Sequence, residues 1–388
     1  MPEGRSQQDR QFGREKLEGL MDEVFGGAVH APRLASLTDG VDGVLHAASL
    51  GVRAIGQGLA VAQGLAPRHA IKPVDRVLSN PKLSMDQVFG CWVPFVVGER
   101  REIFVNFDWT ECEDADQCTV VLGMPTAQGR STPLMWKTVT RSELQEQRND
   151  HEDELLVGFA AVVPKHVRVT VVADRGFSDS KLSRFLTGEL GFDSIIRFRG
   201  GVYVEDAAGE QRKAKAWLGT AGRMRVFRHA RVTTQRHLVP VVVCVQDKAM
   251  KEPWCLVSSR HDLQGVAIQG AYGRRFTVEA TFRDVKHPRF GLGLTQAVIA
   301  RNDRRDALFL LAVLAHTLLT LLGKAGQALG MDRMLGATRP GQLSLFRQGL
   351  MLFELIPTMR EDRLRALATK FGELLHEHVV FTGILGVI

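Results

Sequence analysis

The chain has 388 residues, of which 45% are hydrophobic and 24% are charged, so a globular protein is expected and the length is enough for two or three domains. The formal net charge of +7 favours a polyanionic partner, either nucleic acid or an anionic membrane surface. The five cysteines include no Cys-x-x-Cys pair, so a structural zinc site and a disulfide framework are not expected. Together with a polar N-terminus unlike a secretory signal, this favours a cytoplasmic protein.

The first hundred residues are predicted to be helical, because apolar residues between Leu45 and Val61 recur at helical spacing. The segment that follows contains five basic side chains, namely Arg68, His69, Lys72, Arg76 and Lys82. It is either a solvated connector or an element that contacts DNA, and the segment alone does not decide between them.

From residue 101 the pattern changes to short β-rich runs. Three strands are predicted near residues 102–108, 118–124 and 133–140, followed by a helix over 142–163. The valine-rich run 167–173 predicts a centrally buried strand, followed by a helix over 175–191 and another strand. This order predicts an α/β fold in which helices flank a mixed sheet.

The second half of the chain is predicted to change from strand to helix. Residues 201–270 contain short strand-like runs separated by Gly and Pro, which indicates a β-rich insertion. Helices are predicted from residue 271 onward. The apolar run Ala307–Leu322 is shorter than the roughly 20 residues that a membrane span needs, so it is predicted to be a buried helix.

Three acidic residues are candidates for catalysis. Asp108 and Asp174 end predicted strands, and Glu279 lies in a predicted helix. Such acids can converge at one edge of a sheet, where their mutual repulsion calls for a cation. Mg²⁺ prefers oxygen ligands, and two such ions can support phosphodiester chemistry. Taken singly, either aspartate could instead be a turn residue or a helix cap.

A stripe along the helix that contains Glu279 strengthens this interpretation. Tyr272, Arg275, Glu279 and Lys286 are spaced to share one helix face. A surface ion pair would explain Arg275 and Glu279, but it would not explain the whole stripe beside two strand-end aspartates. A guanidinium can bind a phosphate through two hydrogen bonds, which suits a nucleic-acid substrate.

The pattern Tyr-x2-Arg-x3-Glu-x6-Lys resembles the signature of a large group of bacterial insertion-sequence transposases with a DDE active site. NFDWT, around Asp108, and VVADRGF, around Asp174, are similar to the group's two strand ends that bear aspartates. EPWCLVSS resembles the strand of the group's β-rich insertion whose tryptophan, here Trp254, receives a flipped base. The resemblance covers roughly residues 68–320. Phe276 is a departure, because many members have tryptophan at that position.

The resemblance implies a ribonuclease-H-like fold and a hairpin-forming, cut-and-paste reaction. Asp108, Asp174 and Glu279 would be the catalytic acids and would hold two Mg²⁺ ions, for which Mn²⁺ can substitute. The DNA contacts would include Tyr272, Arg275, Lys286, Trp254 and Arg175.

The implied division of the chain has four parts. They are a helical DNA-binding region at 1–100, a catalytic core at 101–200 and 271–325, the insertion at 201–270, and a helical region at 326–388 that is a candidate for dimerisation. The partners would be double-stranded DNA, meaning the terminal inverted repeats of the element and its target, and a second copy of the chain, within a bacterial cytoplasm and nucleoid. No membrane is expected.

The insertion also carries a candidate DNA surface. Arg223 and Arg225 alternate as in a strand and would share a face, which could follow a phosphate backbone. The other interpretation is a solubilising surface.

Two other functions are compatible with parts of the pattern. A ribonuclease-H-like DNA nuclease without strand transfer would need the same triad, and a DNA-binding repressor or scaffold would need no chemistry. An inactive descendant is expected to have lost at least one of the three acids, and all three are present.

Overall fold

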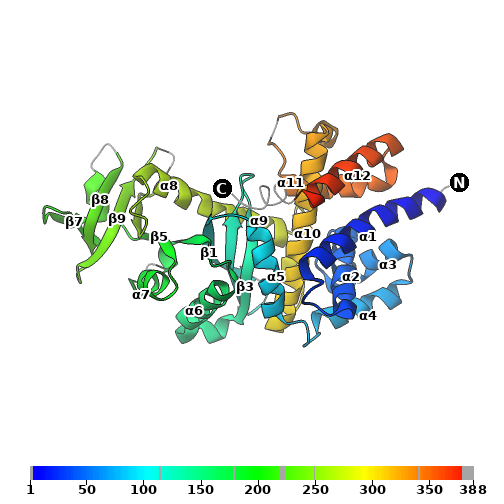
Figure 1. The fold of residues 1–388 in the computed structure, drawn as a ribbon, viewed down its shortest axis with the longest axis horizontal. Helices are drawn as coiled ribbons and strands as arrows, with labels where there is room; N and C mark the ends of the chain where they lie inside the picture. Colours follow the sequence, from blue (N-terminus) through cyan, green and yellow to red (C-terminus); the bar gives the residue numbers. More distant parts are fainter. Residues whose placement is uncertain are drawn as a thin grey trace.

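The computed structural model describes residues 3–112, 115–177, 180–218, 223–248, 250–339 and 341–377. The molecule is elongated, with a sheet that runs from its middle to one end and with the N- and C-terminal helices packed together at the other end (Figure 1). The last residues of the predicted C-terminal region, 378–388, lie outside the described residues.

The N-terminal region is helical, as its apolar spacing predicts. The helices are α1 (Glu3–Phe25), α2 (Ala31–Ala47), α3 (Val52–Gln63), α4 (Pro67–Leu78) and α5 (Met85–Val97). Ser84 caps α5, since its hydroxyl accepts a hydrogen bond from the backbone N–H of Gln87. The basic side chains from Arg68 to Lys82 lie on and just after α4 and are exposed, so this segment is available to a partner or to solvent alike.

The centre of the molecule is a mixed sheet, and one helix connects its third and fourth strands along the chain. Its elements are β1 (Glu102–Cys112), β2 (Gln117–Pro125), β3 (Ser131–Thr140), α6 (Leu144–Val162), β4 (Arg168–Ala173) and β5 (Asp193–Phe198). The spatial order is β3-β2-β1-β4-β5, with β1 to β3 antiparallel and with β1, β4 and β5 parallel. The α/β, ribonuclease-H-like fold predicted from the sequence is confirmed.

Strand β4 is the buried central strand that its valines predict, because all its residues after Arg168 are buried. The helix predicted over 175–191 is confirmed for Ser180–Glu189 but is not one regular α-helix. The described residues form a 3₁₀ turn η2 (Arg175–Phe177), a short helix α7 (Ser180–Arg184) and a π-helix η3 (Phe185–Glu189). Gly176 and Gly188 lower the helix propensity of this segment, which accounts for its irregularity.

The residues predicted as a β-rich insertion form strands that continue the central sheet. They are β6 (Tyr203–Glu205), β7 (Gln211–Lys213), β8 (Arg225–Val232), β9 (His237–Val245) and β10 (Trp254–Ser258), with a 3₁₀ helix η4 (Ala214–Leu218). Strand β10 pairs with β5, and the order continues as β10-β9-β8-β6-β7. One hydrogen-bonded sheet of ten strands results, and its insertion strands lie at the left of Figure 1.

The C-terminal half is helical. Its elements are α8 (Gly265–Gly273), η5 (Arg274–Phe276), α9 (Thr277–Lys286), η6 (Leu294–Gln296), α10 (Asn302–Ala328), η7 (Met331–Leu335), α11 (Leu345–Leu355), η8 (Ile356–Thr358) and α12 (Glu361–His376). Helix α10 is long and apolar enough to cross a membrane, but 94% of its most apolar window is buried inside the protein. The prediction that Ala307–Leu322 forms a buried helix is therefore confirmed.

Helices α10 and α11 touch through their backbones at two glycines. A Cβ atom added at Gly323 would lie 1.9 Å from the carbonyl oxygen of Leu345, and one added at Gly349 would lie 1.7 Å from that of Leu319. No side-chain rotation relieves such a contact, because the obstructing atoms belong to the partner helix's backbone. The two helices can approach this closely only with glycine at both positions.

Gly349→Ala is expected to lower the free energy of unfolding by about 1–3 kcal/mol or more, since the helices must separate to admit a methyl group. Urea unfolding followed by circular dichroism measures the change. Gly90→Ala in α5 is the matched control, because a Cβ there meets nothing within 4 Å. The control is expected to be neutral or stabilising by up to about 1 kcal/mol, and equal effects of the two substitutions would contradict the close-contact explanation.

Candidate active site

The three candidate acids lie on neighbouring elements of the core. Asp174 directly follows β4, as predicted, and Glu279 lies in the first turn of α9. The prediction that Asp108 ends a strand is wrong, because β1 continues to Cys112 through its pairing with β2 and Asp108 lies inside it. Strands β1 and β4 are parallel neighbours in which Phe107 pairs with Ala173. Asp108 and Asp174, the residues that follow this pair, therefore lie side by side at the carboxyl end of β4.

The guanidinium of Arg275 brings these acids together. Its Nη1 donates to Asp108 at 2.8 Å, and its Nη2 lies 3.1 Å from a Glu279 oxygen and 3.7 Å from an Asp174 oxygen. Arg275 itself is only 4% exposed. The contact with Glu279 follows from helical spacing, whereas the contact with Asp108 spans 167 residues of sequence.

Aromatic rings enclose the same group. The Tyr272 hydroxyl donates to Asp174 at 2.9 Å, and the Tyr272 ring lies edge-on to Trp254 with centroids 4.9 Å apart. Phe276 stacks on Trp254 at 5.7 Å, and the Arg275 guanidinium lies 4.8 Å from the centre of the Phe276 ring. Phe276, the departure from the family signature, thus takes part in the aromatic group beside the acids.

The electrostatics of Asp108 reflect this crowding. Burial raises the pKa of Asp108 to about 6, although the Arg275 guanidinium favours its ionised form. The negative charges of Glu279 and Asp174 contribute to this raised pKa. Such a shift marks a carboxylate that is held among like charges and benefits from a nearby cation.

Asp174 and Tyr272 are shifted in opposite directions. Burial alone would raise the pKa of Asp174, but the Arg175 backbone N–H, the Arg275 charge and the Tyr272 hydroxyl together hold it below its ordinary value. Burial and the adjacent Asp174 charge raise the pKa of Tyr272 to about 12. Tyr272 therefore remains a hydrogen-bond donor to Asp174 throughout the physiological range.

The carboxylate oxygens suit Mg²⁺, which prefers hard oxygen ligands. Among the described residues, however, no group of three or more His, Cys, Asp or Glu side chains is arranged to hold a metal ion. The cation that contacts all three acids is the Arg275 guanidinium. The donor chemistry fits a divalent ion, but the arrangement does not fit one until Arg275 moves.

Residues 137–318 match the family model described as "Transposase DDE domain". This part of the chain is similar to a transposase DDE domain, which supports a transposase function. The matched span begins in β3 and ends in α10, so it includes Asp174 and Glu279 but not Asp108. No curated protein matches the chain.

Other residues predicted to contact DNA lie at varying distances from the three acids. Lys286 ends α9 and donates to the backbone carbonyl of Glu111 in β1. Arg175 is exposed and pairs with Glu252 at 3.1 Å, and Glu252 also binds Arg197 at 3.0 Å. The Arg197 guanidinium in turn lies 3.9 Å from Asp174, so this acid also links to the insertion.

Arg223 and Arg225 lie apart from the three acids. Arg225 begins β8 and Arg223 precedes it, and both side chains are exposed. Strands β5, β10 and β9 separate β8 from β4 in the sheet. These arginines therefore belong to a different surface of the insertion.

A second cluster, not anticipated from the sequence, braces the two aspartate-bearing segments. The Trp109 indole, next to Asp108, donates to buried Glu152 of α6 at 2.7 Å. The Arg148 guanidinium binds Glu152 at 2.9 Å and lies over the rings of Trp109 and Phe177, at 5.3 Å and 5.7 Å. Phe177 belongs to the segment after Asp174. Burial raises the pKa of Glu152, while its hydrogen bonds with Trp109 and Arg148 oppose that rise.

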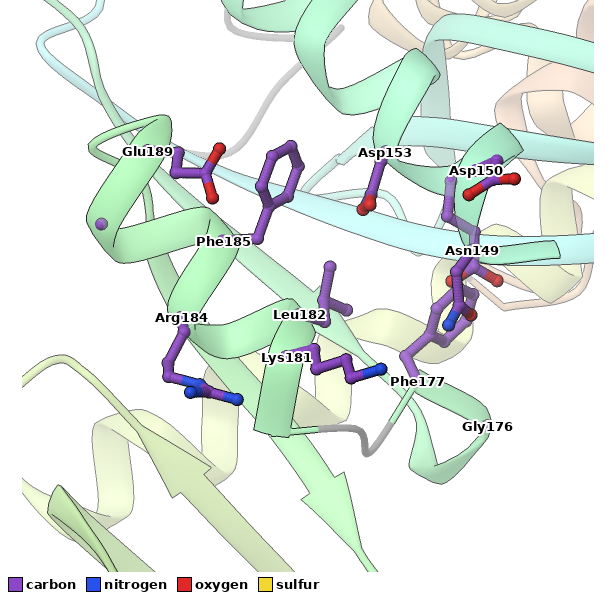
Figure 2. Close-up of a pocket in the computed structure, with 12 residues that line it drawn as sticks. Asn149, Asp150, Asp153, Gly176, Phe177, Lys181, Leu182, Arg184, Phe185 and Glu189 are labelled. Carbon is purple, nitrogen blue, oxygen red and sulfur yellow. The ribbon is translucent and has the colours of Figure 1, made fainter. Parts of the chain in front are cut away.

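A cavity of about 680 Å³ lies between α6 and the α7–η3 segment, beside this cluster (Figure 2). Acidic Asp150 and Asp153 of α6 and, across from them, Lys181 and Phe185 line this cavity, and Figure 2 shows the Asp153 carboxylate pointing toward the opposite wall. Burial, followed by the charges of Asp150 and Glu189, raises the pKa of Asp153. The three candidate acids do not line this cavity, so it is not the site at the carboxyl end of β4.

Trp109→Phe is expected to destabilise the protein by about 1–3 kcal/mol, because buried Glu152 loses a donor to its charged oxygen. Guanidinium chloride unfolding measures the loss. Trp217→Phe provides the matched control, since its indole donates to the neutral carbonyl of Val204 at 3.3 Å. That variant is expected to lose only about 0.5–1.5 kcal/mol, and the interpretation fails if Trp109→Phe costs no more than the control.

Proposed function

We propose that this protein is a DDE transposase that cuts and rejoins DNA at the ends of an insertion sequence. The observation that carries the proposal is the meeting of Asp108, Asp174 and Glu279 at one buried guanidinium, within a chain of which residues 137–318 are similar to a transposase DDE domain. Their elements also bring the three acids together at the carboxyl end of β4, although Asp108 lies far from Glu279 in sequence.

In this proposal the acids are the catalytic ligands of divalent cations, two Mg²⁺ ions for which Mn²⁺ can substitute. Such ions supply activation of a nucleophile and stabilisation of the leaving oxygen in phosphodiester chemistry. Asp108 and Asp174 are fixed by the sheet, whereas the Glu279 side chain is 56% exposed and can adjust. Tyr272 orients Asp174 through its hydroxyl.

The proposed reaction has four steps at one DNA end. Water attacks the phosphodiester and releases a 3′-OH, which then attacks the opposite strand to form a hairpin. A second water opens the hairpin, and the 3′-OH finally attacks target DNA. Each step exchanges one phosphodiester oxygen for another, so no oxidant or nucleotide cofactor is required.

The chain's basic and aromatic residues would grip the DNA during these steps. Arg275, Lys286 and Arg175 would bind phosphates near the cut, with Tyr272 beside them. Extrusion of a base costs a few kcal/mol, which stacking on an aromatic ring such as Trp254 can offset.

The wider assembly would be a homodimer on DNA, because both ends of the element must be held together. Region 1–100 and the exposed arginines Arg223 and Arg225 would contact DNA outside the cut site. Catalysis would take place in the core at 101–200 and 271–325, beside the β-rich insertion at 201–270. The helices from 326 onward would be the candidate dimer contact. The protein would act in the bacterial cytoplasm, at the nucleoid.

The test incubates the protein with Mg²⁺, a labelled duplex carrying the element's own ends, and a target plasmid. Denaturing gels then separate nicked, hairpin and joined products. Hairpin ends followed by joining to the plasmid are expected. Cutting without joining would indicate a nuclease, and binding without cutting would indicate a DNA-binding protein, so either result would overturn the proposal.

A further inference from the structure

Arg275 is a buried counter-ion to the three candidate acids. It is 4% exposed, and both terminal nitrogens of its guanidinium contact carboxylates. Its third nitrogen, Nε, is buried without a hydrogen-bond partner among the described residues. A donor left in this way can be satisfied by an incoming acceptor.

The carboxylates that Arg275 holds are unequal. The side chain of Asp108 is 18% exposed and that of Asp174 is 30% exposed, whereas that of Glu279 is 56% exposed. An ion pair with an exposed partner is weak, so the contact with Glu279 is the most easily exchanged. The contact with Asp108 is shorter and better shielded from water.

A divalent cation and the guanidinium compete for the same oxygens. Three carboxylates around one monovalent charge retain a net negative charge that attracts a metal ion, but the nearby guanidinium repels it. A DNA phosphate is the competing acceptor with the right chemistry, because it can take two parallel hydrogen bonds from a guanidinium.

We propose that Arg275 is a built-in counter-ion that holds Asp108, Asp174 and Glu279 together, and that a DNA phosphate draws its guanidinium away and so opens the acids to divalent cations. The inference rests on the proposed function, since it takes DNA as the substrate and the three acids as metal ligands. Arg275 acts as a positioning residue in this scheme. By thermodynamic linkage, DNA then raises metal affinity, and metal raises DNA affinity by the same factor.

The first test measures Mn²⁺ binding to the full chain without DNA, by electron paramagnetic resonance of the free ion. Arg275→Gln is expected to bind Mn²⁺ at least about tenfold more tightly than wild type, a change within the usual range of coupling between sites. Arg274→Gln is the charge-matched control. The Arg274 side chain is exposed and makes no contact with the three acids among the described residues, so the control is expected to bind as wild type does.

Arg275→Gln binding Mn²⁺ as weakly as wild type, or more weakly, would overturn the proposal. Because a buried arginine can be needed for folding, circular dichroism checks each variant, and Arg275→Lys serves as a second variant. A lysine has one nitrogen and cannot bridge all three acids, so at least about a threefold gain in Mn²⁺ affinity is expected. A folded Arg275→Lys protein without that gain would contradict the counter-ion role on its own.

The second test repeats the Mn²⁺ binding measurement in the presence of a duplex carrying the element ends. The Mn²⁺ that the duplex binds in the absence of protein is measured separately and subtracted. The duplex is expected to raise the Mn²⁺ affinity of wild type to within about twofold of Arg275→Gln, because phosphate replaces the acids as the guanidinium's partner. If Arg275→Gln still binds Mn²⁺ tenfold more tightly than wild type with the duplex present, the proposal that a DNA phosphate draws Arg275 away from the acids is overturned. The binding assays involve no turnover, so tighter Mn²⁺ binding by Arg275→Gln in a protein that never cuts DNA would refute transposition but not the counter-ion.

Discussion

Glu279→Gln is expected to reduce cleavage of a duplex bearing the element ends by about 10²–10³-fold, the size of effect that loss of one preorganised electrostatic group produces. The substitution keeps the shape of the side chain and removes one of the three negative charges. The side chain of Glu279 is 56% exposed, so little folding energy depends on it. The measurement is a single-turnover gel assay in Mg²⁺, accompanied by an electrophoretic shift that shows the variant still binds the duplex.

The matched control for this assay is Glu354→Gln in α11. Glu354 is exposed and makes no described contact with the acids. The control is expected to cleave as wild type does. Wild-type cleavage by Glu279→Gln would remove Glu279 from the catalytic set, whereas equal loss in both variants would point to a general effect of lowered charge.

Asp284→Asn is expected to lower the free energy of unfolding by about 3–5 kcal/mol, which is the usual result of removing one partner of a buried ion pair. Asp284 lies in α9, and its side chain is 9% exposed. Its carboxylate accepts hydrogen bonds from the Arg130 guanidinium in the β2–β3 turn and lies 3.4 Å from His316 Nε2 in α10. The substitution leaves the Arg130 charge without its counter-charge between three elements that position Glu279.

Urea unfolding measures this loss, and Glu361→Gln serves as its control. Glu361 pairs with Arg365 one helical turn away on the exposed face of α12. Exposed pairs of this kind contribute about 0–1 kcal/mol, so the control is expected to change little. If Asp284→Asn lowers the free energy of unfolding no more than the control does, the contacts of Asp284 with Arg130 and His316 do not stabilise the fold.

The same pair predicts a pH dependence. Burial would raise the pKa of Asp284, but its hydrogen bonds with His316 and Arg130 hold the pKa below its ordinary value. The folded pKa is lower than the unfolded one, so the ionised pair stabilises the fold above about pH 4, and that stability is lost as the pH falls through the folded pKa. Asp284→Asn is expected to flatten the acid side of the stability profile, measured as the urea midpoint between pH 3 and 7. An unchanged slope would assign the acid dependence to other carboxylates.

Local patterns in the sequence predict the parts of the site that lie on one element. The valines of β4 predict a buried strand that ends at Asp174, and helical spacing predicts that Arg275 and Glu279 share a face. These features depend on the periodicity of a strand or a helix, which a single sequence displays directly.

The contacts between distant segments could not be predicted in the same way. Arg275 reaches Asp108 across 167 residues, and the Trp109 indole reaches Glu152 across 43. Such contacts depend on how the sheet and helices pack, and no local pattern encodes them. The irregularity of the η2–α7–η3 segment was also missed, because its hydrophobic spacing is helical while its glycines weaken a regular helix.

The unbroken hydrogen bonding from β5 into β10 has a consequence for any attempt to shorten the protein. Removal of the strands from Tyr203 to Ser258 would make β5 an exposed edge strand. Its unpaired backbone N–H and C=O groups could then pair with β-strands of other chains. Ile195 and Ile196 of that strand are fully or almost fully buried, so the exposed edge would also present hydrophobic side chains to other molecules. The half of the chain that bears the three acids is thus expected to aggregate when expressed without these strands, and a shortened protein would have to keep at least β10 and β9.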